Sequence, residues 1–278
     1  MAVALASESL ERVVRAALAE DVGPGDVTTD ALFDASTVGT AQLLVKEPGV
    51  LCGLDPAEAV FRALDANVEV EPLARDGDLV EPRAVALVRG RLRALLTGER
   101  TALNLLGRLS GVATLTRRYV DAVEGTGARI LDTRKTTPGL RELEKYAVAC
   151  GGGTNHRRGL YDAVLVKDNH VRLAGGLAVA VERLRAAAVG PPIQVEAETL
   201  ADVREALAAG ADSILLDNMP PEALRQAVAL AGGRVPLEAS GGITLDSVRE
   251  VAATGVDFIS IGALTHAARS LDVSMEVP

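Results

Sequence analysis

The chain has 278 residues, of which 48% are hydrophobic and 24% charged, and this balance excludes a disordered or fibrous protein. Its 38 acidic and 29 basic side chains give a net charge of −9, which disfavours general binding to nucleic acid or to anionic membranes. Aromatic residues are only 2% of the chain and Trp is absent, which disfavours the base-stacking surfaces of single-strand-binding proteins.

The N-terminal part of the chain is typical of a small α+β domain. Apolar residues recur at helical spacing over 10–18, Ser7 or Ser9 can cap this helix, and a Gly-Pro-Gly cluster follows it. From about 37 to 96, the β-rich runs GTAQLLVKE, VEVEPLA and AVALVRGRLRALL predict an antiparallel sheet, interrupted by a helix over about 55–64. A long helical stretch, GERTALNLLGRLSGVATLTRRYVDAV, leads into a different region.

After about residue 128 the pattern becomes a repeat of strand, loop and helix. Six runs predict strands: ARILDTRK, DAVLVKDN, PIQVEAET, DSILLDN, VPLEASGG and DFISIGAL. The last four begin 21, 22 and 22 residues apart, which is the length that a parallel crossover through a helix needs. The number of units favours an α/β barrel over an open sheet, and a dinucleotide-binding sheet loses support because no GxGxxG follows a first strand.

Polar residues end each predicted strand. In an α/β barrel the carboxyl ends of the strands share one rim, and the active site lies there, so these side chains are expected to converge. In chain order they are Asp132-Thr133-Arg134-Lys135, Lys167-Asp168-Asn169-His170, Glu196, Asp217-Asn218, Ser240-Gly241-Gly242 and Gly262.

The expected rim has a sign pattern. Residues 129–172 contain nine Lys or Arg against five Asp or Glu, and such a cluster suits a multiply charged anion. Glu196 and Asp217 offer paired oxygen ligands of the kind that suits Mg²⁺ beside a phosphate. Gly241 and Gly242 allow backbone N–H groups to approach a phosphate, helped by the start of the next helix. The residues therefore indicate group transfer from a phosphorylated sugar to an acceptor with several negative charges.

At these residues the sequence resembles the quinolinate phosphoribosyltransferase family. The signature block is LDTRKTTPGLRELEKYAVACGGGTNHRRGLYDAVLVKDNH, and EDVGPGDVTTD, GERTALNLLGRLSGVAT, ILLDNM, EASGGI and TGVDFISIGALTHA also match in order. The resemblance implies a reaction that joins quinolinate to phosphoribosyl pyrophosphate and yields nicotinate mononucleotide, pyrophosphate and carbon dioxide, as a step of NAD biosynthesis.

The resemblance also implies roles for individual residues. Arg134, His156, Arg157 and Lys167 would hold the two quinolinate carboxylates, and Arg100 would reach the same pocket from a neighbouring subunit. The residues that would bind phosphoribosyl pyrophosphate and its Mg²⁺ are Lys135, Glu196, Asp217, Ser240, Gly241, Gly242 and Gly262. Of these, Glu196 and Asp217 would bind the metal. The catalytic residues would be Lys135, Lys167, Glu196 and Asp217. Gln194 stands where family members often have a second acid, whereas His170, His266 and Arg141 are left unassigned.

The family's architecture, that of type II phosphoribosyltransferases, implies an N-terminal α+β sandwich domain over 1–110 and an incomplete α/β barrel over 111–266. A tail over 267–278 would pack back on the N-terminal domain. We also expect a homodimer with shared active sites, for which a trimer of dimers is a further arrangement, and no nucleic-acid or membrane partner.

The two cysteines and the N-terminal sequence bear on the compartment in which the protein works. Two cysteines are too few for a disulfide framework, and the start MAVALASES lacks the regions of a secretory signal, so we expect a cytoplasmic protein. No spacing around Cys150 indicates a metal, and it is expected to be a small buried side chain.

Three alternatives stay open. Lys167 at the end of an apolar strand is compatible with a Schiff-base lyase, because a desolvated lysine is a good nucleophile. The cationic cluster is also compatible with a protein that binds an anion without turnover. In the third alternative, the protein is a transferase of the same class that acts on another pyridine or a related acceptor.

Overall fold

The computed structural model describes residue 5 and residues 7–188 and 190–277. Packing divides the chain into two compact units. The first comprises Met1–Arg117, Thr136–Gly152 and Leu264–Pro278, and the second comprises Arg118–Lys135 and Gly153–Ala263. Residues 136–152 thus group with the first unit, although they lie within the range 111–266 that was expected to form the barrel domain.

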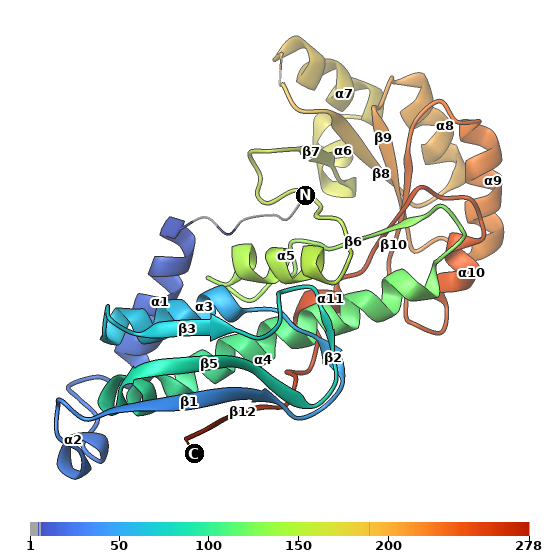
Figure 1. Cartoon of the computed structure of the whole chain (residues 1–278). Helices are drawn as coiled ribbons and strands as arrows, with labels where there is room; N and C mark the ends of the chain where they lie inside the picture. The colour runs from blue at the N-terminus through green and yellow to red at the C-terminus, as the bar shows by residue number, and fades with distance from the viewer. Residues whose placement is uncertain (1–4, 6, 189, 278) are drawn as a thin grey trace. The chain divides into compact units, whose positions relative to one another are not determined.

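The first unit is built on an antiparallel sheet with the strand order β12-β1-β5-β3 (Figure 1). Buried residues alternate along β1 at Ala41, Leu43 and Val45, as expected for a strand with one face on the core. Its elements are α1 (Ser7–Asp21), α2 (Thr29–Leu32), β1 (Val38–Val45), β2 (Gly49–Val50), α3 (Leu54–Leu64), β3 (Glu69–Pro72), β4 (Leu79–Val80), β5 (Arg83–Arg91), most of α4 (Leu92–Ala122), α5 (Arg141–Cys150), most of α11 (Ala263–His266) and β12 (Val273–Glu276).

The helices predicted over 10–18 and about 55–64 are confirmed, but the last predicted β-rich run is only partly a strand. The ladder between β1 and β5 ends at Val38↔Arg91, and α4 begins at the next residue, Leu92. Leu92, Leu95 and Leu96 follow helical spacing as well as they follow a β-rich run, so hydrophobicity alone could not place this boundary.

The second unit is a six-stranded parallel sheet with the order β6-β11-β10-β9-β8-β7. All six predicted strands are confirmed. The elements are β6 (Arg129–Leu131), β7 (Val164–Val166), α6 (Asp168–Ala174), α7 (Leu177–Ala186), β8 (Ile193–Ala197), α8 (Leu200–Ala208), β9 (Ser213–Asp217), α9 (Pro221–Ala231), β10 (Leu237–Ser240), α10 (Val248–Ala252) and β11 (Phe258–Ser260). Figure 1 shows α8 and α9 outside β8 and β9.

This strand order is that of a barrel with one gap. Consecutive strands from β7 to β11 are neighbours, and β11 pairs with the first strand, β6. Among the described residues no ladder joins β6 to β7. Instead, the chain beside β6 is held at Thr154, whose N–H donates to the Ile130 carbonyl at 2.8 Å and whose carbonyl accepts from the Asp132 N–H at 3.2 Å. The expected incomplete α/β barrel is therefore present, and none of the described helices is long and apolar enough to span a membrane.

The two cysteines lie together in the first unit. The Sγ atoms of Cys52 and Cys150 and a carboxylate oxygen of Asp76 are all within 4.8 Å of one another. Asp76 accepts hydrogen bonds from the N–H groups of Gly53 and Leu54 at 2.8 and 3.2 Å, which cap the start of α3. Asp76 also accepts the Tyr146 hydroxyl at 2.9 Å, so helix capping and Tyr146 together account for its hydrogen bonds. Sequence spacing could not foresee that the two thiols meet.

Backbone approaches backbone closely at Gly111 in α4. A Cβ atom there would lie 1.9 Å from the carbonyl oxygen of Arg269, and the same chain segment donates the Leu271 N–H to the Gly107 carbonyl at 2.9 Å. The Arg269 carbonyl and Gly111 itself both belong to the backbone, so a clash between them cannot be relieved by a change of side-chain rotamer.

We expect Gly111→Ala to lower the free energy of unfolding by about 2–4 kcal/mol, because the new methyl forces α4 away from the segment at Arg269. Urea unfolding measures this change. Asn104→Ala, at an exposed position of the same helix, is the control and should stay within about 0.5 kcal/mol of the parent. Equal stability of both variants would show that α4 and this segment do not pack as described.

Candidate active site

Strand register places several predicted site residues on one face of the parallel sheet. Glu196 lies opposite Leu215, and Asp217, two residues further along β9, lies opposite Ser240. Because side chains alternate along a strand, Glu196, Asp217 and Ser240 share the face that Leu215 occupies. The other face, with the buried residues of β8, is covered by helix α8, so the shared face is the inside of the barrel.

Lys167 and Glu196 are in direct contact. The Lys167 Nζ lies 2.6 Å from the Glu196 Oε2, and the lysine side chain is 50% exposed whereas that of the glutamate is 10% exposed. His170 supports this arrangement, since its Nδ1 accepts the Lys167 N–H at 3.0 Å and closes the first turn of α6. Two residues expected to serve different substrates thus lie side by side, and His170 has a local structural role.

A hydrogen bond links the chain directly after β9 to the last residue of β10. Asn218 has φ of 54°, its N–H donates to the Ser240 carbonyl at 2.9 Å, and its Nδ2 donates to Asp217 Oδ2 at 2.8 Å. A Cβ atom on Gly241, whose φ is 97°, would lie 2.1 Å from the Asn218 Oδ1. Glycine is therefore required at 241 by the approach of Asn218 as well as by the backbone conformation.

The neighbouring Gly242 has a different setting. Its φ is 61° and a Cβ atom would meet nothing within 4 Å, so space remains beside its backbone. Helix α10 begins only at Val248, so the expected help from the next helix start does not apply directly at the glycine pair. Gly262, in contrast, immediately precedes the short helix α11.

The segment that carries His156 is held by a buried carboxylate. Asp132 is fully buried, and its two oxygens accept the His156 N–H at 2.8 Å and the Asn155 Nδ2 at 2.7 Å. Because Asp132 follows directly on β6, it fixes the chain in the gap between β6 and β7. Arg157, the next residue, donates its Nη1 to the Ala163 carbonyl at 3.0 Å.

Two guanidinium groups lie near each other at this gap. Burial and the positive charge of Arg134 lower the pKa of Arg157, which places the two cations within electrostatic reach. Like charges held together in a partly buried site favour a bound anion, and guanidinium groups match carboxylates geometrically. Of the predicted acceptor-binding residues, these two have the clearest electrostatic signature.

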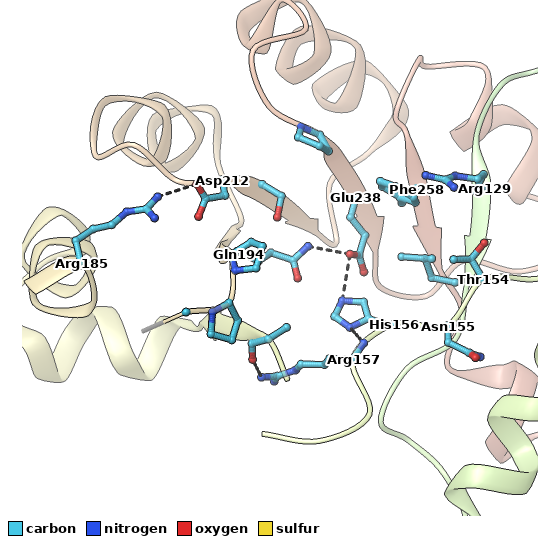
Figure 2. A pocket seen from close by; sticks show the side chains of 17 residues that line it. Arg129, Thr154, Asn155, His156, Arg157, Arg185, Gln194, Asp212, Glu238 and Phe258 are labelled. Carbon is cyan, nitrogen blue, oxygen red and sulfur yellow. Dashed lines mark hydrogen bonds and ion pairs between the residues drawn. The ribbon is translucent and has the colours of Figure 1, made fainter. Parts of the chain in front are cut away.

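A cavity of about 830 Å³ occupies the barrel interior on the amino-terminal side of these residues. His156 and Arg157 line it, together with Gln194 and Glu238, as Figure 2 shows. Gln194 Nε2 lies 2.8 Å and His156 Nε2 3.3 Å from the same oxygen, Glu238 Oε2. The predicted residues Lys167, Glu196, Asp217 and Ser240 do not line this cavity.

Glu238 is the most deeply buried acid among these contacts, with a side chain 4% exposed. Burial alone would raise its pKa, but hydrogen bonds from His156, Gln194 and Ser260 and the charge of His156 outweigh burial and lower the pKa below its ordinary value. The carboxylate is therefore ionised at neutral pH.

Three of the remaining candidate residues, Lys135, Arg100 and His266, are exposed. Lys135 is exposed in the second unit, where its N–H donates to the Thr133 Oγ1 at 3.0 Å. Arg100 is an exposed residue of α4 in the first unit, and His266 is also exposed there. Arg141, in the first unit, donates its Nε to the Thr136 Oγ1 at 2.9 Å.

Glu238 was not identified as a candidate site residue from the sequence, and Asp132 was named only among the polar residues that end the strands. Glu238 is a single acid in the otherwise apolar run VPLEAS, and Asp132 is the first polar residue after ARIL. An isolated charge in or directly after a buried strand needs a partner, so both carried a usable signal. What the sequence could not supply was the partner, His156 in each case.

Comparisons with known proteins agree with these observations. The sequence model described as "Quinolinate phosphoribosyl transferase, C-terminal domain" matches residues 112–276, and that of the N-terminal domain matches residues 26–110. The chain is 44% identical over 270 residues to a probable nicotinate-nucleotide pyrophosphorylase [carboxylating] of Bacillus subtilis, covering 96% of this chain and 93% of the relative. It is 47% identical over 265 residues to the protein of the same name from Synechocystis, covering 94% and 90%.

The fold also resembles solved structures. A nicotinate-nucleotide pyrophosphorylase from Francisella tularensis superimposes with a TM-score of 0.95 at 41% identity, covering 99% of this chain and 98% of that one. A structure from Streptococcus pyogenes gives the same TM-score at 42% identity, with the same coverage.

The lowered pKa of Glu238 predicts how the stability of the fold depends on pH. Because the folded pKa lies below the ordinary value of 4.5, the ionised carboxylate stabilises the fold above that pH, and this stabilisation is lost as the pH falls through the folded pKa. We expect Glu238→Gln to cost about 1–3 kcal/mol at pH 7 and less at pH 4, as measured by urea unfolding. A loss of the same size at both pH values would contradict this assignment.

Proposed function

Because the chain belongs to the quinolinate phosphoribosyltransferase family, we propose that it transfers the phosphoribosyl group of phosphoribosyl pyrophosphate to quinolinate with decarboxylation. The products are nicotinate mononucleotide, pyrophosphate and carbon dioxide, and the reaction is a step of NAD biosynthesis. The observation that carries this proposal is the match of both family domains, over residues 26–110 and 112–276.

The acceptor side of the site is assigned to cations. Arg134, Arg157 and Lys167 would bind the two carboxylates of quinolinate, with His156 contributing to the same subsite. The proximity of Arg134 to Arg157 supports this role, since a dianionic acceptor would relieve their repulsion. Arg100 would complete the subsite from a partner subunit in a homodimer.

The donor side is assigned to the ends of β8, β9 and β10 and to the turn before α11. Glu196 and Asp217, on the same inner face of adjacent strands, are oxygen ligands suited to Mg²⁺. When bound, Mg²⁺ neutralises charge on the pyrophosphate group. Ser240, Gly242 and Gly262 would contribute hydroxyl and backbone groups to phosphate, as would Lys135 and Gly241.

The reaction then needs charged side chains that bind and orient the two substrates, and it needs no covalent nucleophile from the protein. The pyridine nitrogen forms a bond to the ribose C1 carbon as the bond from that carbon to pyrophosphate breaks, and Lys135 stabilises the departing charge. The resulting pyridinium withdraws electrons, so the adjacent carboxylate leaves as carbon dioxide and its bonding electron pair stays on the ring carbon, which takes up a proton. Arg134 and Arg157 hold the ring in place throughout.

The Schiff-base alternative finds little support in the geometry. A lysine that forms an imine is activated by desolvation, whereas Lys167 is half exposed and lies 2.6 Å from the Glu196 carboxylate. Borohydride trapping with labelled substrate separates the two mechanisms, because only a lyase would leave an adduct on Lys167.

The decisive experiment measures release of carbon dioxide from carboxyl-labelled quinolinate. We expect release that requires both phosphoribosyl pyrophosphate and Mg²⁺. Calorimetric binding of quinolinate without any release, under the same conditions, would instead identify a noncatalytic anion-binding protein. Turnover with another pyridine acid but not with quinolinate would point to a different acceptor within the same reaction class.

Lys135→Ala and Lys167→Ala should each lower kcat/KM at least about 100-fold while the fold is retained, because each removes a cation from a substrate subsite. The matched control is Lys46→Ala, which removes an exposed ion pair with Glu276 and should leave activity unchanged. Near-parental activity of either site variant would remove that lysine from the assignment.

A shared site predicts complementation between two inactive variants. Arg100→Ala subunits mixed with Glu196→Ala subunits should regain activity, because one site of each mixed dimer then has both native residues. Differently tagged subunits, purified as heterodimers, allow the rate to be measured on the mixed species alone. Heterodimers that stay inactive would show that Arg100 does not act across a subunit boundary.

A further inference from the structure

We propose that Glu238 is a positioning residue of the acceptor subsite, acting through His156 on the turn that carries Arg157, and that Gln194 keeps Glu238 available for this contact. The proposal rests on the proposed function for its kinetic consequences, but not for its structural ones.

A continuous set of hydrogen bonds runs across the barrel interior. Glu238 Oε2 accepts from Gln194 Nε2 at 2.8 Å and lies 3.3 Å from His156 Nε2, and the Arg157 N–H donates to His156 Nδ1 at 2.7 Å (Figure 2). Three segments, β8, β10 and the chain in the β6–β7 gap, are thereby joined by side chains.

The backbone contact fixes the state of the imidazole. A peptide N–H can only donate, so His156 Nδ1 must be the accepting nitrogen and the ring proton must be on Nε2, which faces Glu238. Both ring nitrogens are then used within the protein. His156 acts in this structure by holding Arg157 and not by pointing an N–H group at a substrate carboxylate.

The arginine at the end of this set is held from two sides. Its backbone is tied to the His156 ring, and its Nη1 donates to the Ala163 carbonyl at 3.0 Å. A guanidinium that must meet a planar carboxylate loses less conformational entropy on binding when its backbone is already fixed. Loss of the Glu238 contact would therefore weaken acceptor binding more than donor binding.

Gln194 is the residue that makes a single ionised acid feasible here. An acid at 194 would place a second carboxylate within hydrogen-bond distance of Glu238 Oε2, and two such groups cannot both be ionised. The shared proton would remove charge from the oxygen that faces His156. An amide at 194 donates a hydrogen bond instead and leaves the negative charge on Glu238.

The other groups around Glu238 are few. The Ser260 hydroxyl, on β11, contributes to the low pKa of Glu238. Phe258, also on β11, lies opposite Glu238, and the Arg129 guanidinium is 4.6 Å from the centre of the Phe258 ring. His156 is thus the ring that touches the carboxylate, and Arg129 is the nearby cation on the amino-terminal side.

The histidine state can be tested without any substrate. The chain has only three histidines, so nitrogen-15 labelling gives three imidazoles, and His170→Gln and His266→Gln identify the signals of His156. We expect an accepting Nδ1 and a protonated Nε2 at neutral pH. We also expect Glu238→Gln to shift the Nε2 resonance of His156 at fixed pH, because the nitrogen that faces residue 238 loses its carboxylate partner. A proton on Nδ1, or an Nε2 resonance that Glu238→Gln leaves unchanged, would overturn the proposal.

Kinetics test the consequence for the acceptor. In Glu238→Gln we expect the KM for quinolinate to rise at least tenfold and the KM for phosphoribosyl pyrophosphate to change less than twofold, in protein shown to be folded by its thermal transition. Glu222→Gln is the matched control, since Glu222 is an exposed acid of α9 that pairs with Arg225 at 3.1 Å and does not line the cavity. It should leave both KM values and the His156 signals unchanged.

The exchange of the two side chains separates contact from charge. Gln194→Glu combined with Glu238→Gln keeps one acid and one amide but moves the acid away from the His156 contact. We expect this double variant to have a KM for quinolinate as high as that of Glu238→Gln. If the fold only needs one acid and one amide at these two positions, the KM should instead return to the parental value. If the parent releases no carbon dioxide from quinolinate, the proposed function fails, and the histidine spectra still decide whether Glu238 positions Arg157.

Discussion

The register of the parallel strands is the constraint on which the candidate site depends. Because Glu196, Asp217 and Ser240 face inward only through the pairings of β8, β9 and β10, a slip of one residue in any pair would turn a carboxylate toward the covering helices. Apolar residues between them resist that slip, since Val195 and Leu216 would have to exchange a buried environment for the barrel interior. The burial of apolar residues that stabilises the sheet therefore also determines that its polar side chains face the barrel interior.

The inner face carries its charges in two layers. At the carboxyl ends of the strands, Lys167 and Glu196 compensate each other, and the half-exposed Lys167 is accessible enough to exchange partners when charged substrates arrive. One layer deeper, Glu238 and His156 are withdrawn from solvent and linked to neutral or backbone groups. The outer layer suits reversible binding, and the inner layer suits fixed geometry, because desolvated hydrogen bonds are costly to break.

Much of the architecture could be predicted from the sequence because it is local. The six strands after residue 128 are short apolar runs at regular spacing, and each was found where expected. The boundary at Leu92 could not be placed, because the same leucines satisfy two periodicities. The placement of Cys52 beside Cys150, and of Asp132 and Glu238 beside His156, depends on contacts between distant residues that no local pattern encodes. Family resemblance named residues at the rim, and the supporting network beneath them emerged only from the three-dimensional contacts.

Strand β12 has a consequence for the behaviour of the protein in solution. It pairs with β1 through four residues and so covers a backbone edge that would otherwise be open along β1. The new edge is short and bears the ion pair of Lys46 with Glu276, features that discourage sheets of separate molecules from joining. Removal of Val273–Glu276 would therefore expose unpaired peptide groups along β1, and we expect the shortened protein to aggregate.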